Sequence, residues 1–383
     1  MSSALVEASI IIDMNDDRGL WEVQAQSLTA PPHFKEETMH NPLGLLGILL
    51  ISQAVAFEIH PVSWRGGAND YDSSAVQLEF RADASAAQCH LRSYILDSRN
   101  QAIHEIITRQ AYQPAYAKVL RGRTWLLPLL GGVEWNDDPE ELTRKAWHYN
   151  GARHILLFKA HEENAGRPNT LTRRVHHGDL QFLHSMRAAD ESDAQARAKM
   201  YRWLEYTYRV AIGKVPANTV RKSTPYHEFF GKVGCSRNPQ LADPSDCTVL
   251  DVFDMKHMYR QGDQEENLRS LAAGAIAHLI QDSYSASHTL RENGTGRLLQ
   301  LYTYDAENQK SHCEKDGAYE SNRAGIDMAR AMTTELLGYV HRRESWEKAS
   351  AFFYQTLGAP DAGPATTERR AGAVTDTWVS ITR

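Results

Sequence analysis

The strongest chemical signal in the sequence is a histidine and an aspartate spaced for one face of a helix. Residues 278–288 read HLIQDSYSASH, so His278 and Asp282 are four residues apart and His288 follows six residues after Asp282. Side chains four apart project from the same helix face, and the preceding apolar run AAGAIA predicts that this helix is buried. An isolated buried charge is costly. The pattern therefore indicates either metal ligands or a hydrogen-bonded His–Asp pair in a core.

A second pair with the same spacing follows later in the chain. His312 and Asp316 lie four residues apart where another helix is predicted to begin. The helix dipole also favours acidic residues at such a start. The pair points to metal binding only in combination with the other segments.

Three earlier segments also contain ligand-type residues. His104 lies at the start of a predicted amphipathic helix, and Asp137 and Asp138 are adjacent in a turn, where a solvated helix cap is the alternative. The segment HHGDLQFLHSM, which contains His176 and His184, places three histidines and an aspartate among apolar residues. Packing alone does not explain this third segment.

Together the segments predict a metal centre built from several helices. Imidazole nitrogens and carboxylates suit zinc, and clustered zinc ions form a site for phosphate groups. We expect two or three zinc ions. The predicted ligands are His104, Asp137, His176, His184, His278, Asp282, His288, His312 and Asp316.

The order of these motifs resembles the superfamily of zinc-dependent phospholipases C and single-strand zinc nucleases. The resemblance covers residues 100–330 and implies a mostly helical fold with a trinuclear zinc cluster. In that family a helix carries His-x-x-x-Asp, a histidine follows six residues later, and a His-x-x-x-acid pair comes next. The matching residues are His278, Asp282, His288, His312 and Asp316, with His104 and Asp137 as the early histidine and the aspartate after a tryptophan.

The resemblance does not decide which residues of this chain supply two of the zinc ligands. One zinc site needs a further histidine between the early and central motifs, for which His176 is favoured and His184 is the competitor. The best-known family members also use an N-terminal tryptophan on one zinc ion. No tryptophan closely precedes His104, so the third site is expected to be rebuilt, for example with Asp138, or to be missing.

The implied activity is that of a secreted zinc-dependent phosphodiesterase. We expect a phospholipase C that hydrolyses phosphatidylcholine-like lipids at a membrane surface to diacylglycerol and a phosphorylated head group, with Asp137 or Asp138 as the catalytic carboxylate that orients the attacking water or takes its proton. The alternatives are a single-strand-specific nuclease, for which Arg173 and Arg174 would permit a basic groove, and a non-catalytic helical zinc-binding protein.

Composition narrows the classes of protein to which this chain can belong. The chain has 383 residues, of which 42% are hydrophobic and 23% charged, as in ordinary globular proteins. This balance excludes a mostly disordered chain and a polytopic membrane protein. The net charge of −6 does not favour a nucleic-acid binder. Four cysteines without a Cys-x-x-Cys motif make neither a disulfide scaffold nor a four-thiolate metal site. Cys235 and Cys247 are close enough in sequence for a local disulfide in an oxidising compartment.

The chain is predicted to contain one mainly α domain, residues 100–355, with a multi-helix phospholipase C or zinc-nuclease-like fold. Short β-like pieces are expected in an N-terminal extension, 57–99, and a loose tail in 356–383, apart from the apolar stretch 378–381. The apolar run 43–56 ends in Ala-Val-Ala and is shorter than the about 20 residues of a membrane-spanning helix. It predicts a signal peptide, 39–56, beginning at Met39, an over-extended or disordered leader, 1–38, and a secreted or periplasmic protein.

A long loop, 289–311, is expected between the two later ligand motifs. It contains Leu298, Leu299, Leu301, Tyr302 and Tyr304. These side chains either form an apolar rim that meets a lipid surface or pack the loop onto the helical body.

Overall fold

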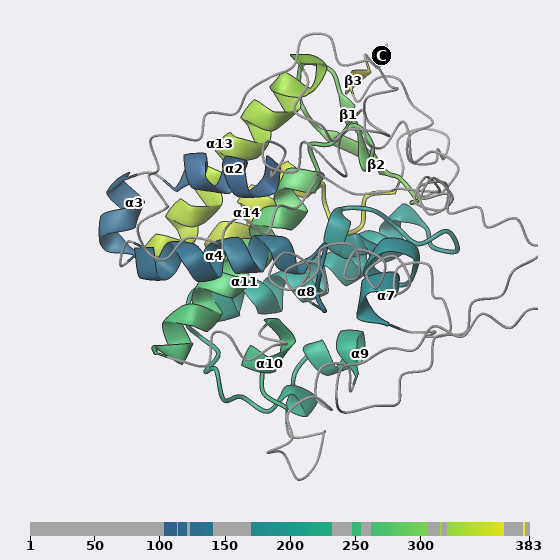
Figure 1. The fold of residues 1–383 in the computed structure, drawn as a ribbon. Coiled ribbons are helices and arrows are strands. Elements are labelled where there is room, and N and C mark those ends of the chain that lie inside the picture. Colours follow the sequence, from purple (N-terminus) through teal and green to yellow (C-terminus); the bar gives the residue numbers. More distant parts are fainter. Residues whose placement is uncertain are drawn as a thin grey trace, which may run out of the picture. The chain divides into compact units, whose positions relative to one another are not determined.

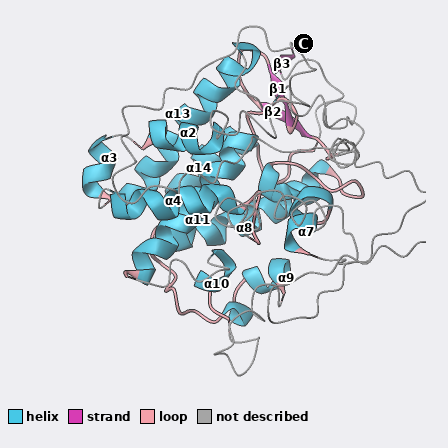
Figure 2. Cartoon of the chain, viewed as in Figure 1, coloured by secondary structure: helices cyan, strands magenta, loops and turns pink. Residues whose placement is uncertain are grey.

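The computed structural model describes residues 103–112, 114–120, 123–140, 170–231, 247–253, 262–304, 315, 320–363 and 378–379. These residues are mainly helical (Figure 2), which confirms the predicted mainly α class. The leader, the signal peptide and the extension 57–99 lie outside the described residues, so the predictions for them are untested. Within the described part of the chain, no helix combines the length and apolar character needed to cross a membrane.

Helices of very different length make up most of the described structure. Single turns of 3-10 helix occur at Gln181–His184, Arg221–Ser223 and Glu320–Asn322. The α-helices are α2 (Ile103–Ala111), α3 (Pro114–Val119), α4 (Arg123–Trp135), α7 (Leu171–His177), α8 (Asp193–Ala211), α9 (Tyr226–Phe230), α10 (Leu250–Phe253), α11 (Gln264–Asp282), α13 (Arg323–Arg342) and α14 (Trp346–Leu357).

Helix α11 is the central element of the core. The Asp263 side chain caps its N-terminus by accepting a hydrogen bond from the Glu266 amide, and the first turn contains Glu265 and Glu266, which suits the helix dipole. From Leu268 onward every residue of α11 is buried. The helix packs against α4, α8, α13, α10 and α2 (Figure 1). Because it is covered on all sides, its polar residues must find partners inside the protein.

Two glycines allow α4 and α11 to approach at backbone distance. A Cβ atom on Gly132 would lie 2.0 Å from the carbonyl oxygen of Leu271, and one on Gly274 would lie 2.1 Å from that of Leu129. Any larger residue would push the helices apart. The close approach brings the C-terminal end of α4, which leads into Asp137, beside the turn of α11 that carries His278.

A small sheet follows α11, in the order β2-β1-β3. Strands β1 (Thr289–Glu292) and β2 (Leu298–Leu301) are antiparallel, with Thr289 opposite Leu301 and an irregularity after Leu290. Gly294 and Gly296 adopt positive φ in the connecting turn, a conformation that glycine adopts without steric cost. β3 (Trp378–Val379) pairs in parallel with β1. It lies in the apolar stretch 378–381, the part of 356–383 that is not predicted to be loose.

The hairpin corrects the expectation of a long loop with an apolar rim. Leu301 and Tyr302 are fully buried, and Tyr302 belongs to a small second core with Met186, Leu290 and Leu299. The rim hypothesis is therefore wrong for these side chains. The alternative, that they pack onto the helical body, is correct because strand pairing lets the apolar residues point inward while the glycine turn stays at the surface.

Candidate metal centre

Seven of the nine predicted ligands come together in the interior. They are contributed by α2, the segment after α4, α7, the 3-10 turn Gln181–His184, α11 and the residue before β1. All seven side chains are buried, none being more than 2% exposed: His104, Asp137, His176, His184, His278, Asp282 and His288. The other two predicted ligands, His312 and Asp316, lie outside the described residues.

The carboxylate of Asp282 is the common contact of four histidines. Its Oδ2 atom lies 2.8 Å from Nδ1 of His184, 3.0 Å from Nε2 of His278 and 3.6 Å from Nδ1 of His288. Its Oδ1 atom lies 3.2 Å from Nε2 of His104. The i, i+4 pair predicted from the sequence is thus formed, and it is surrounded by imidazoles from three other segments.

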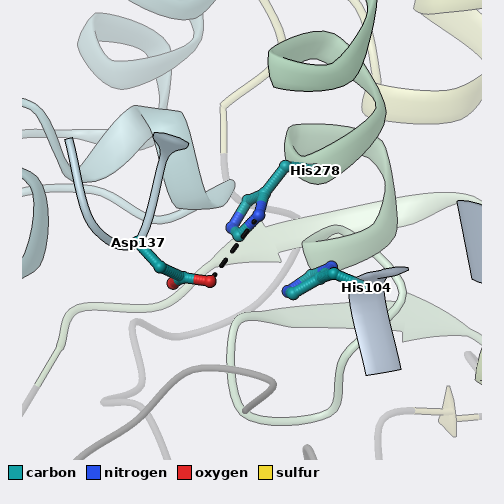
Figure 3. Close-up of side chains that lie close together, drawn as sticks. All are labelled: His104, Asp137 and His278. Atoms are coloured by element: carbon teal, nitrogen blue, oxygen red, sulfur yellow. Dashed lines mark ion pairs between the residues drawn. The ribbon is translucent and has the colours of Figure 1, made fainter. Parts of the chain in front are cut away.

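Asp137 supplies a second carboxylate near two of the same histidines. Its Oδ1 lies 3.7 Å from Nδ1 of His184, and its Oδ2 lies 3.7 Å from Nδ1 of His278. Figure 3 shows the Asp137 side chain pointing toward the ring of His278, with the His104 ring beside it. The rings of His104 and His278 stack with centroids 3.9 Å apart.

The side chains form three overlapping groups, each with ligand atoms within 4.8 Å of one another. His184, His278 and Asp137 each belong to two of them. The overlap means that ions held by neighbouring groups would share ligands. The groups are His104–Asp137–His278, Asp137–His176–His184 and His184–His278–Asp282.

Backbone carbonyls fix the protonation of four imidazoles. A carbonyl oxygen only accepts hydrogen bonds, so the ring nitrogen next to it must carry the hydrogen, and in a neutral ring the other nitrogen has a lone pair. The four contacts run from Nδ1 of His278 to Val133 O (2.7 Å), Nε2 of His184 to Asn136 O (3.1 Å), Nδ1 of His288 to His184 O (2.7 Å) and Nδ1 of His176 to Thr172 O (2.8 Å).

The result is a place where hydrogen-bond acceptors face one another. The lone pair on Nδ1 of His184 lies 2.8 Å from Asp282 Oδ2 and 3.2 Å from Nε2 of His278. Protons do not resolve the conflict, because burial lowers the pKa of His278 to about 3 and also lowers the pKa of His184. Burial alone would raise the pKa of Asp282, but His288, His278 and His104 outweigh it and hold that pKa well below its usual range.

This donor set fits a metal cation. An ionised carboxylate and neutral imidazole lone pairs converge in a buried space, which is costly unless a positive charge lies among them. The Oδ1 atom of Asp282 accepts no hydrogen bond of standard geometry from the described part of the chain. Nitrogen and carboxylate ligands of this kind suit zinc and other first-row divalent ions. The buried His/Asp cluster can therefore hold a metal ion.

The structure brings both competing histidines into the cluster. His184 contacts Asp282 directly, whereas His176 groups with Asp137 and His184. Asp138 is buried as well, but it belongs to none of the three groups of described residues.

A frame of polar contacts holds α7, and with it His176, against the segment after α4. Oε2 of Glu140 accepts hydrogen bonds from the amide and hydroxyl of Thr172, at 3.3 and 2.8 Å. The carbonyl of Thr172 in turn receives the hydrogen bond from His176. Farther along α7, Arg174 makes a bidentate ion pair with Asp179.

Sequence reasoning missed the residues that orient the ligands. The backbone carbonyl of Asn136 accepts a hydrogen bond from His184. The side-chain NH₂ group of Asn136 donates to the backbone carbonyls of Leu183 and Ala275. Gln281 accepts from His104 at 2.7 Å. A glutamine on an otherwise apolar, buried stretch of helix was the available signal for Gln281, whereas a contact to a backbone carbonyl leaves no trace in the sequence.

Cys247 is disulfide-bonded, and its partner lies outside the described residues. The predicted pairing with Cys235 is therefore untested.

The chain matches no protein-family model, no curated protein and no solved structure.

Proposed function

We propose that this protein is a secreted zinc-dependent phosphoric diester hydrolase, most specifically a phospholipase C that acts on phosphatidylcholine-like lipids. The observation that carries the metal-dependent part is the convergence of His184, His278 and Asp282, whose mutually facing acceptors need a cation. The phosphodiester class of substrate depends on the order of ligand motifs, which phospholipases C and single-strand nucleases share. The choice of lipid over nucleic acid depends on the net charge of −6, which does not favour a nucleic-acid substrate.

The chain's own residues supply a rigid set of ligands. Asp282 would be shared between ions, because it contacts histidines on both of its oxygens. Each imidazole is held in orientation by a hydrogen bond from its other nitrogen, which is how proteins fix metal-binding histidines. When bound, zinc supplies Lewis acidity toward a phosphodiester and lowers the pKa of a water molecule.

Asp137 is the proposed catalytic carboxylate. Its Oδ1 lies 3.7 Å from His184 and its Oδ2 lies 3.7 Å from His278, so it would orient a water molecule beside the ions or accept its proton. Each group contains three candidate ligands among the described residues, and the predicted ligands His312 and Asp316 lie outside them. Sites with an open coordination position would support catalysis, whereas closed sites with four protein ligands would support a non-catalytic zinc-binding protein.

The disulfide at Cys247 supports the proposed export, because disulfides persist in oxidising compartments and are rare in the cytosol. N-terminal sequencing of the mature protein tests this part. A mature end near Phe57 is expected, and an abundant form that begins at Met1 would contradict it.

An activity screen of the zinc-loaded protein tests the proposed reaction. The substrates are a choline phospholipid, a phosphoinositide and single-stranded DNA, each assayed with and without a chelator. Chelator-sensitive release of a phosphorylated head group from the choline lipid is expected. Cleavage of DNA alone would replace the lipase with the nuclease, and inactivity on all three substrates with zinc bound would favour the non-catalytic alternative.

A further inference from the structure

His104 differs from the other described histidines of the cluster in the partner that decides which ring nitrogen carries the hydrogen. The other four donate to backbone carbonyls. The Nδ1 atom of His104 instead lies 2.7 Å from Oε1 of Gln281. An amide side chain can turn either its oxygen or its NH₂ group toward a neighbour, so the tautomer of His104 depends on which way Gln281 is held.

Two threonines hold the Gln281 amide in one orientation. Its Nε2 atom donates to Oγ1 of Thr108 at 2.8 Å and to Oγ1 of Thr333 at 3.2 Å. The hydroxyl of Thr333 donates its own hydrogen to the carbonyl of Ala329 at 2.8 Å, so its oxygen is left to accept. The NH₂ group of Gln281 therefore faces the threonines and its oxygen faces His104.

This orientation has a direct consequence for the metal centre. With Nδ1 of His104 donating to Gln281, the lone pair of the neutral ring is on Nε2, which lies 3.2 Å from Oδ1 of Asp282. If the amide were reversed, Nδ1 would accept and Nε2–H would donate to Asp282. That arrangement would be a satisfied, metal-free His–Asp hydrogen bond.

We propose that Gln281, held by Thr108 and Thr333, is a positioning residue that keeps His104 in the metal-binding tautomer and so disfavours the metal-free His–Asp pair. The proposal rests on the proposed zinc centre. It assigns a role to contacts that join α2, α11 and α13, since Thr108 lies on α2, Gln281 on α11 and Thr333 on α13. All of these side chains are fully or almost fully buried, so water does not compete for the hydrogen bonds.

Replacement of Gln281 by methionine tests the proposal. The thioether keeps a similar length and removes both the acceptor and the donors. Zinc affinity is measured by titration against a competing chelator, and coordination is followed by the visible absorption of the cobalt-loaded protein. We expect affinity for at least one ion to fall about 10–100-fold, as when outer hydrogen-bond partners of metal ligands are removed, with a changed cobalt spectrum.

The tautomer itself is read by long-range ¹H–¹⁵N correlation of the histidine rings in the zinc-loaded protein. In the wild type, His104 is expected to carry its hydrogen on Nδ1. A double variant, Thr108→Val with Thr333→Val, keeps Gln281 but removes both acceptors of its NH₂ group, and it should weaken zinc binding in the same direction. Thr333→Ser, which retains the hydroxyl, should bind zinc as the wild type does.

Thr207→Val is the matched control. Thr207 is also fully buried, and its hydroxyl contacts the Tyr226 hydroxyl at 2.8 Å. This variant loses a core hydrogen bond and should lower the thermal midpoint without changing zinc affinity or the cobalt spectrum.

The outcomes separate the two proposals. If the wild type binds no zinc or cobalt, the proposed zinc centre fails and this inference fails with it. If the wild type binds zinc while Gln281→Met and the threonine double variant retain its affinity and spectrum, the zinc centre stands and the positioning role is overturned. If Gln281→Met does not fold, the threonine variants and the ring tautomer of the wild type decide the question.

Discussion

Replacement of Gly132 by alanine should damage the proposed metal centre more than it damages the fold. The added Cβ atom would lie 2.0 Å from the carbonyl oxygen of Leu271, and distances below 3.0 Å require a shift. The obstacle is backbone, which cannot rotate away, so α4 and α11 must separate locally by about 1 Å (3.0 Å less 2.0 Å).

The effect on stability is expected to be modest. Overpacking of this kind costs typically about 1–3 kcal/mol, and the better helix propensity of alanine offsets up to about 1 kcal/mol. The net loss of about 0–3 kcal/mol leaves most proteins of this size folded.

The effect on the proposed centre is expected to be large, because its candidate ligands depend on both helices: α11 carries His278 and Asp282, and Asp137 follows α4. Val133, next to Gly132, accepts the hydrogen bond that orients His278, and Asp137 follows the same helix. Metal–ligand distances tolerate deviations of only about 0.2 Å. A shift of about 1 Å should therefore remove an ion or lower zinc affinity by at least tenfold, and misplacement on this scale can cost about 100-fold in rate.

The assay compares zinc titrations and thermal unfolding of both proteins with and without chelator. Gly338→Ala on α13 is the control, since its Cβ would meet only the flexible ends of Arg342 and Tyr116, at 3.1 and 3.3 Å. That variant should keep full zinc content. If Gly132→Ala also kept wild-type zinc affinity and activity, the close helix approach would not be what positions the centre.

Further predictions concern the same centre and the hairpin beside it. Metal analysis of protein prepared without chelator should find at least two zinc ions per chain, and one or none in a folded sample would refute a cluster. Asp282→Asn keeps the volume but removes the charge that offsets the cations, so zinc content and activity should be lost with a shift in thermal midpoint of only a few degrees; full retention of both would identify an ordinary buried hydrogen bond. Replacing both Leu301 and Tyr302 by serine should reduce cleavage of vesicles and of soluble short-chain lipid equally, because both side chains are buried, and a loss confined to vesicles would contradict this placement.

The sequence alone predicted the residue types of the buried His/Asp cluster and the mainly α class of fold. The four-residue spacing of His278 and Asp282 on an apolar helix predicts a shared, buried face, and the structure has both side chains fully buried and 3.0 Å apart. Local rules are enough here, because helix periodicity fixes which neighbouring side chains meet. The mainly α character follows from the same periodicity.

The tertiary structure decided which distant residues complete the centre. Only folding shows that His184 meets Asp282 and that Nδ1 of His104 lies within hydrogen-bond distance of Gln281. It also decided that Leu301 is buried in a hairpin rather than exposed on a rim. The physical reason is the same in each case: these contacts join segments far apart in the chain, and their geometry depends on backbone carbonyls, glycine approaches and strand pairing that side-chain identity does not encode.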